Sequence, residues 1–164
     1  PGSGAILKGA SLSVTAAESS TGTTPSNLSS YDLAFQATAS DSKLWLQATL
    51  NISNSDATTL GYFYNSTAGE MAGAIGDADG PKQRGMWRSL CTNNAFVMSM
   101  TYGTWYEPGN TTNNTYQIFG NANAGTTMYI NRSGDTTDND NINYSRTASV
   151  FTILEFAASV ITLS

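Results

Sequence analysis

The chain has no histidine and only one cysteine among its 164 residues. Without histidine it has neither an imidazole general base nor an imidazole metal ligand. Serine-triad, cysteine–histidine and imidazole–zinc chemistries are therefore excluded. The single cysteine, Cys91, rules out an intrachain disulfide framework and a cysteine-rich zinc site, and we interpret it as a small core residue. We expect no cofactor.

Charged residues are also scarce, at 12% of the chain, with a net charge of -5. This acidic balance disfavours counterion-driven binding to nucleic acid. No apolar run reaches the ~18 residues that a membrane-spanning helix needs. The polarity comes instead from Thr, Ser, Asn and Gly, which make up almost half of the chain.

The first three residues, Pro1-Gly2-Ser3, are typical of the remnant of a cleaved fusion tag. We therefore expect residues 4–164 to form one β domain, the C-terminal part of a longer chain. A domain of this length can bury a sizeable core.

Alternating hydrophobicity predicts strands throughout the sequence. In residues 43–52, leucine, alanine and isoleucine occupy every even position, which predicts a half-buried strand. Residues 33–39 alternate in the same way, and we predict a hairpin that turns through Ser40, Asp41 and Ser42. Further strands are expected at 10–16, 60–64, 95–106, 116–119, 128–130 and 148–156.

Long polar tracts separate these segments, and we predict loops at 18–30, 77–85, 107–115 and 134–143. Short strands at regular intervals with turn residues between them favour an antiparallel sandwich, jelly roll or barrel. The fold class expected is therefore all-β.

The last predicted strand is apolar on both faces, which is unusual for an antiparallel sheet. Its apolar residues are Val150, Phe151, Ile153, Leu154 and Phe156. One face can lie in the core while the other meets a partner chain. Alternatively, the strand is central and is covered by loops of its own chain.

Two groups of cations are candidate binding residues. Arg84 and Arg88 flank Trp87, and arginine beside an aromatic ring is a common anchor for carboxylates, sugars and partner proteins. A solvated loop is the alternative. Arg146 precedes the last strand, where it could pair with Glu155 or hold an anionic ligand at a subunit boundary.

The acidic residues give only partial motifs. Residues 77–80 begin like a calcium loop, and Asp135, Asp138 and Asp140 form a second cluster, but solvated turns have the same composition. Glu107, beside Trp105 and Tyr106, is the best candidate for glycosidase chemistry, although nothing fixes the second carboxylate that such chemistry needs. We therefore predict neither a metal site nor an enzyme.

The segment Tyr144–Phe156 resembles the closing strand of the head domains of bacteriophage tail fibres and tail needles. Tyr144, Arg146, Ser149 and Glu155 match that pattern. The rest of the chain resembles the C-terminal needle knob of short-tailed enterobacterial phages in length and composition. The resemblance implies a TNF-like jelly roll that forms a homotrimer at the tip of the virion tail. It also implies a structural role in envelope attachment or penetration and in genome ejection.

In a trimer of this kind we expect the subunit contact to involve the last strand and neighbouring aromatics, namely Tyr102, Phe151, Ile153, Leu154 and Phe156. Expected further partners are a host cell-surface glycan or envelope component, and a small anionic ligand between subunits. Arg146 or the Arg84–Arg88 segment would hold that ligand.

A different class of function also fits the composition. A monomeric carbohydrate-binding module of a secreted enzyme or adhesin would have a concave face that carries Trp45, Trp105 and Tyr106. Saccharide binding by the monomer would distinguish it from the trimeric knob.

Overall fold

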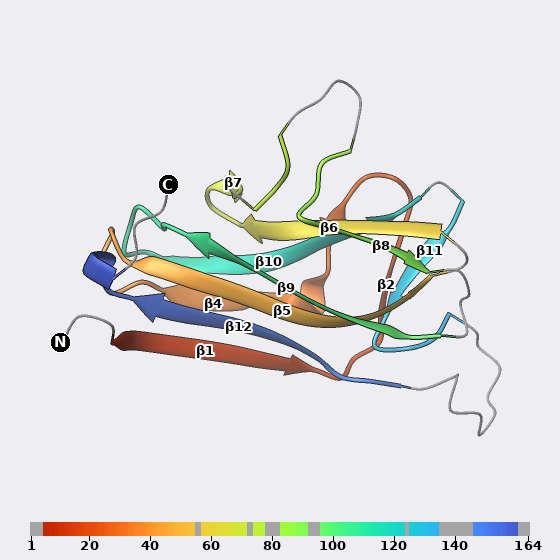
Figure 1. Ribbon diagram of the computed structural model, residues 1–164, viewed down its shortest axis with the longest axis horizontal. Helices are drawn as coiled ribbons and strands as arrows, with labels where there is room; N and C mark the ends of the chain where they lie inside the picture. Colours follow the sequence, from red (N-terminus) through yellow and green to blue (C-terminus); the bar gives the residue numbers. More distant parts are fainter. Residues whose placement is uncertain are drawn as a thin grey trace.

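The computed structural model describes residues 5–54, 57–71, 74–77, 83–91, 96–123, 125–134 and 146–160. Over these ranges the chain is all-β, with two antiparallel sheets that form a sandwich (Figure 1). The described helical segments are two short 3-10 turns, Ser29–Tyr31 and Ala158–Val160. None of the helices described could span a membrane. The predicted all-β class is thus confirmed.

The first sheet is built around β5 (Lys43–Asn54), its longest strand. On one side β5 pairs with β12 (Ser149–Phe156), which pairs in turn with β1 (Ile6–Val14). On the other side it pairs with β9 (Met98–Tyr106). The far end of β5 pairs with β11 (Thr127–Ile130), next to β2 (Glu18–Thr21). β12 is therefore an interior strand.

The second sheet centres on β10 (Asn113–Ala122) and β6 (Ala57–Asn65), which pair with each other. β3 (Ser26–Asn27) and β4 (Leu33–Gln36) lie along the outer edge of β10. β7 (Gly69–Glu70) and β8 (Trp87–Cys91) lie along the outer edge of β6.

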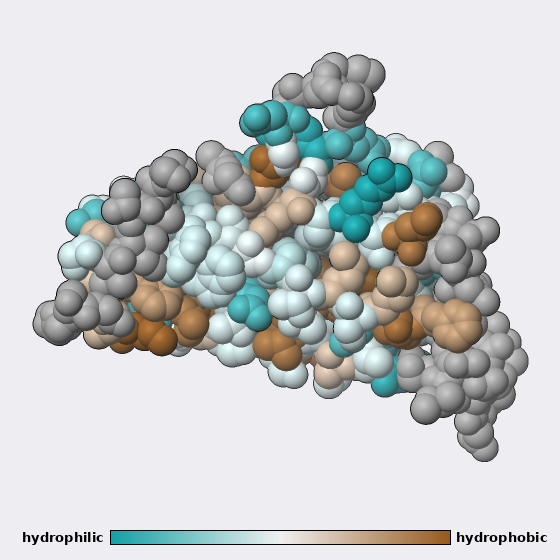
Figure 2. Space-filling view, viewed as in Figure 1, coloured by the Kyte–Doolittle hydropathy of each residue, from teal (hydrophilic) through white to brown (hydrophobic). Residues whose placement is uncertain are grey.

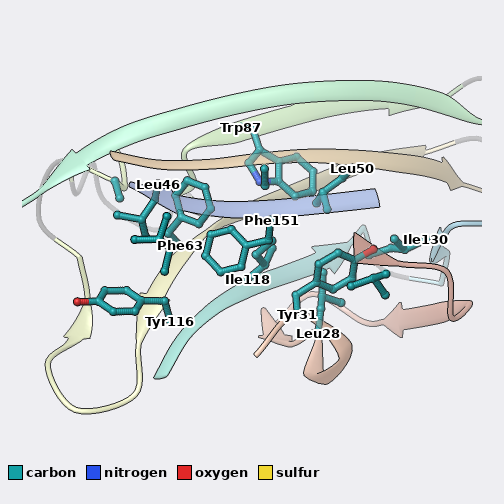
Figure 3. Close-up of a cluster of buried hydrophobic side chains, with 14 of the residues drawn as sticks. Leu28, Tyr31, Leu46, Leu50, Phe63, Trp87, Tyr116, Ile118, Ile130 and Phe151 are labelled. Carbon is teal, nitrogen blue, oxygen red and sulfur yellow. The ribbon is translucent and has the colours of Figure 1, made fainter. Parts of the chain in front are cut away.

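The core fills the space between the two sheets. It is built from the apolar residues that alternate with polar ones along the strands. The even-numbered residues of β5 from Leu44 to Ile52 are fully buried. The opposite sheet supplies Phe63, Tyr116 and Ile118 (Figure 3). The Phe63 ring stacks on Phe151 with 5.5 Å between centroids, so that an aromatic contact joins the sheets.

The predicted hairpin between residues 33–39 and 43–52 is wrong. β4 pairs with β10 in the second sheet, whereas β5 lies in the first. The segment between them crosses from one layer to the other. Two strands that are adjacent in sequence and joined by a polar turn have the same local pattern whether they pair or change sheets.

Four strands lie where no strand was predicted. β2 and β3 fall in the expected loop 18–30, and their Ser- and Asn-rich sequences carry no apolar alternation. β8 begins at Trp87, two residues after the predicted loop 77–85, and includes Arg88 of the cationic segment. The fourth, β7, has only two residues.

Candidate functional site

The outer face of the first sheet carries a cluster of large apolar side chains. In the strand register, Leu154 lies opposite Trp45, which lies opposite Trp105, and Phe156 lies opposite Ile6. We call these five residues the apolar face. Figure 2 shows hydrophobic side chains grouped at the left end of the molecule, where β1 begins and β12 ends.

The rings of the apolar face touch one another. The centroids of Trp45 and Trp105 are 5.1 Å apart, and those of Trp105 and Phe156 are 5.3 Å apart. The Trp45 indole covers Gly103, where an added Cβ would come within 2.4 Å of the ring. Glycine at this position therefore allows the indole to lie against the sheet.

Hydroxyl side chains also lie on this face, and they bond to each other across strands. Ser11 and Thr152 share a hydrogen bond of 3.0 Å, and Thr49 and Thr101 share one of 2.9 Å. These hydroxyl groups are thus paired with one another, and the Trp45 indole N–H donates to Gln47 Oε1 at 3.1 Å.

The residues of the predicted trimer contact divide between the two sides of the sheet. Phe151 and Ile153 face the core and are fully buried. Tyr102 faces the same way, with its ring 5.1 Å from that of Phe63, and burial raises the pKa of its hydroxyl well above the usual range. Of the predicted residues, Leu154 and Phe156 therefore remain on the outer surface. Ile6 was not predicted there. The two tryptophans were expected on an exposed face only in the saccharide-binding alternative, and alternation along residues 43–52 places Trp45 on the side opposite the leucines.

The predicted saccharide-binding trio divides in the same way. Trp45 and Trp105 lie outward, but Tyr106 points between the sheets, where its ring meets Tyr116 edge-on at 6.0 Å. Burial raises the pKa of the Tyr106 hydroxyl.

Glu107, the candidate catalytic acid, forms an ion pair with Lys43 at the margin of the apolar face. Lys43 is 9% exposed, whereas about half of the Glu107 side chain is exposed. The carboxylate therefore neutralises a nearly buried cation, which is a structural role.

The cationic segment around Trp87 is split by the alternation of β8. Trp87 points inward and is 6% exposed, with its indole over Gly61, while Arg88 points outward. Arg84 bonds to the backbone oxygen of Gly76 at 2.7 Å and lies 3.6 Å from the Glu70 carboxylate. Of the three, Arg88 is the one that lines a pocket.

The pocket lies on the outer side of the second sheet and has a volume of about 380 Å³. Its wall combines one cation, two asparagines and a glutamine with a short apolar stretch. The lining residues are Thr58, Leu60, Gln83, Arg88, Asn121, Ala122 and Asn123.

The predicted pairing of Arg146 with Glu155 is wrong. Arg146 precedes β12, and its backbone pairs with that of Arg132 in an isolated antiparallel β-bridge. Glu155 lies near the other end of β12, about 20 Å from the first residue of that strand at the usual rise. Its fully buried carboxylate accepts hydrogen bonds from Thr38 N at 2.6 Å, Thr38 Oγ1 at 2.9 Å and Ser42 Oγ at 2.6 Å. Glu155 thereby fixes the segment that crosses from β4 to β5.

The acidic motifs lie largely outside the described residues, which include Asp77 but not 78–80, 135, 138 or 140. Where the chain is described, no group of three or more cysteine, aspartate or glutamate side chains converges as a metal site would require.

Two surfaces thus emerge as candidates: the apolar face on the first sheet and the pocket on the second. The chain matches no family model and no curated protein, so these surfaces carry the functional argument.

Proposed function

We propose that this chain is the distal knob of a bacteriophage tail needle or tail fibre, a virion structural protein and not an enzyme. Three copies would associate as TNF-like jelly rolls at the tail tip, where they act in envelope attachment or penetration and in genome ejection. The observation that carries the proposal is the apolar face, because two of its five residues, Leu154 and Phe156, belong to the strand that ends the phage-like motif.

The composition of this face is typical of a protein contact. An antiparallel sheet usually presents polar side chains to water on the side away from the core. Here two tryptophans, a phenylalanine, a leucine and an isoleucine lie there instead, and Ile6 is 55% exposed. Tryptophan and phenylalanine are enriched where proteins meet, and a contiguous apolar patch is a mark of an interaction site.

The absence of net charge on the apolar face makes further copies of the chain an acceptable partner. Each copy carries a net charge of -5, so a contact that includes charged surface would place like charges together. The five residues of the apolar face are uncharged, and the adjacent Lys43 and Glu107 neutralise each other. Cyclic symmetry would bring the three faces together around one axis.

A charge placed within the apolar face tests this proposal. Leu154→Glu should convert a trimer into a folded monomer, seen as a threefold lower mass by analytical ultracentrifugation with an unchanged far-ultraviolet circular dichroism spectrum. The matched control is Asn113→Glu, which adds the same charge at an exposed position on the second sheet and should leave the mass unchanged. A trimer that persists in folded Leu154→Glu would refute this contact.

The adjacent indoles favour a second candidate, the monomeric carbohydrate-binding module. Two tryptophans 5.1 Å apart on an open sheet could stack on a sugar ring, and Trp45 Nε1 holds Gln47 Oε1 beside them at 3.1 Å. In that case a monomer would bind oligosaccharides, and Trp105→Ala would abolish the binding.

A further inference from the structure

The pocket on the second sheet contains polar groups that the fold leaves unused. It lies away from the apolar face, since its strand residues belong to β6, β8 and β10 of the second sheet. A ligand could bind there without the trimer proposed above, so an experiment can contradict either the trimer or the binding pocket and leave the other standing.

Arg88 supplies a positive charge to this pocket. Its Nη2 donates to Thr58 Oγ1 at 3.3 Å, a long and weak bond for a guanidinium group with five N–H donors. Arg84, by contrast, is engaged with Glu70 and with the Gly76 carbonyl. Arginine binds carboxylates well, because its planar group can donate two parallel hydrogen bonds.

Asn121 supplies a buried acceptor. This side chain is 1% exposed, and its Nδ2 donates to Thr23 O at 2.6 Å and to Gln83 Oε1 at 3.1 Å. Because the Thr23 carbonyl can only accept, the Asn121 amide cannot be turned the other way. Its Oδ1 is buried and has no hydrogen-bond partner among the described residues, which is costly unless a ligand donates to it.

Gln83 holds this arrangement in place. Its Nε2 donates to the same Thr23 carbonyl at 2.7 Å, so that both of its polar atoms are committed. The Asn121 carbonyl is therefore preorganised, and binding would not have to order it. Leu60 adds apolar surface beside these polar groups.

We infer that this pocket binds an acidic sugar residue, with its carboxylate on Arg88 and a ring hydroxyl donating to Asn121 Oδ1. The apolar wall would meet the C–H face of the sugar ring. A simple carboxylate satisfies Arg88 alone, and a neutral sugar satisfies Asn121 alone. The volume of about 380 Å³ lies within the range of small-molecule sites.

The test is a titration of the ¹⁵N-labelled chain with d-glucuronate, d-glucose and acetate, followed by NMR. We expect saturable shifts of the Asn121 side-chain amide with glucuronate, and binding at least about tenfold weaker with either of the other two probes, because each lacks one of the two polar contacts. Equal affinity for acetate or for glucose, or no shift of this amide at millimolar glucuronate, would overturn the assignment.

Variants test the role of the cation. Arg88→Gln is a change at an exposed site and should weaken glucuronate binding at least about tenfold. The control Arg132→Gln removes the same charge outside the pocket, where the guanidinium lies over Tyr129, and should bind as the unmodified chain does. Undiminished glucuronate binding by Arg88→Gln would contradict the proposed contact.

Discussion

Asn131 is a single residue that joins three strands through its side chain. It is fully buried and has a positive φ of 60°. The two N–H groups of its Nδ2 are shared among Val14 O at 2.8 Å, Ala16 O at 3.0 Å and Tyr31 Oη at 3.1 Å, and its Oδ1 accepts from Ser149 Oγ at 2.5 Å. It therefore ties the end of β1 and the start of β12 to the end of β11.

Two substitutions of Asn131 should separate the stability that comes from its side-chain hydrogen bonds from the cost of its left-handed backbone conformation. Asn131→Gly loses the hydrogen bonds but tolerates the left-handed backbone, and we expect a cost of about 3 kcal/mol. Asn131→Ala should cost about 1 kcal/mol more, because a Cβ disfavours that conformation. Urea unfolding of both variants measures the difference, and an alanine variant as stable as the glycine variant would contradict the backbone argument.

Buried phenols should make the fold sensitive to alkaline pH. Burial raises the pKa of Tyr31, Tyr102 and Tyr116 above the usual value of 10.0. Their neutral forms stabilise the folded state fully below pH ~10, and this contribution is lost as the pH rises from there towards the folded-state pKa.

Tyr116→Phe should therefore shift alkaline unfolding, followed by circular dichroism, to higher pH. Stability at neutral pH should change little, since the buried Tyr116 hydroxyl has no hydrogen-bond partner among the described residues. Tyr31→Phe is the comparison, because it loses the bond to Asn131 and should cost about 1 kcal/mol at neutral pH. An unchanged alkaline midpoint in Tyr116→Phe would argue against the effect of burial.

At the scale of strands, alternation in the sequence predicted the elements better than their partners. β5, β9 and β12 lie close to their expected ranges, because each presents one continuous apolar side to the core. The pairing of β4 with β10 was missed, since it joins residues about eighty positions apart in the chain. No local pattern encodes a contact of that range.

Close packing between strands depends on Gly61 in β6. An added Cβ there would lie 2.2 Å from Trp87 Cζ2 and 2.6 Å from the Phe119 carbonyl oxygen. Because neighbouring backbone cannot yield easily, Gly61→Ala should destabilise the fold by about 3 kcal/mol. Gly76→Ala meets its nearest atom at 3.7 Å and should change the stability little. Equal thermal midpoints for the two variants would contradict this packing.

At the scale of the whole molecule, composition and the closing motif suggested a function for the chain. They did not indicate which surface of the molecule carries that function. The sequence identified aromatic and arginine side chains as candidates for binding. The structure shows which of them face the core and which face outward. Trp87 and Phe151 face inward; Trp105 and Arg88 face outward. The pocket could not be foreseen, because Leu60, Arg88 and Asn121 come from three separate strands, β6, β8 and β10.

The molar mass of the unmodified chain in solution tests the central claim most directly. Light scattering at low micromolar concentration should give about 52 kDa, three times the 17.3 kDa of one copy. A mass near 17 kDa would contradict the trimeric knob, because the apolar face would then remain open to solvent in the isolated protein.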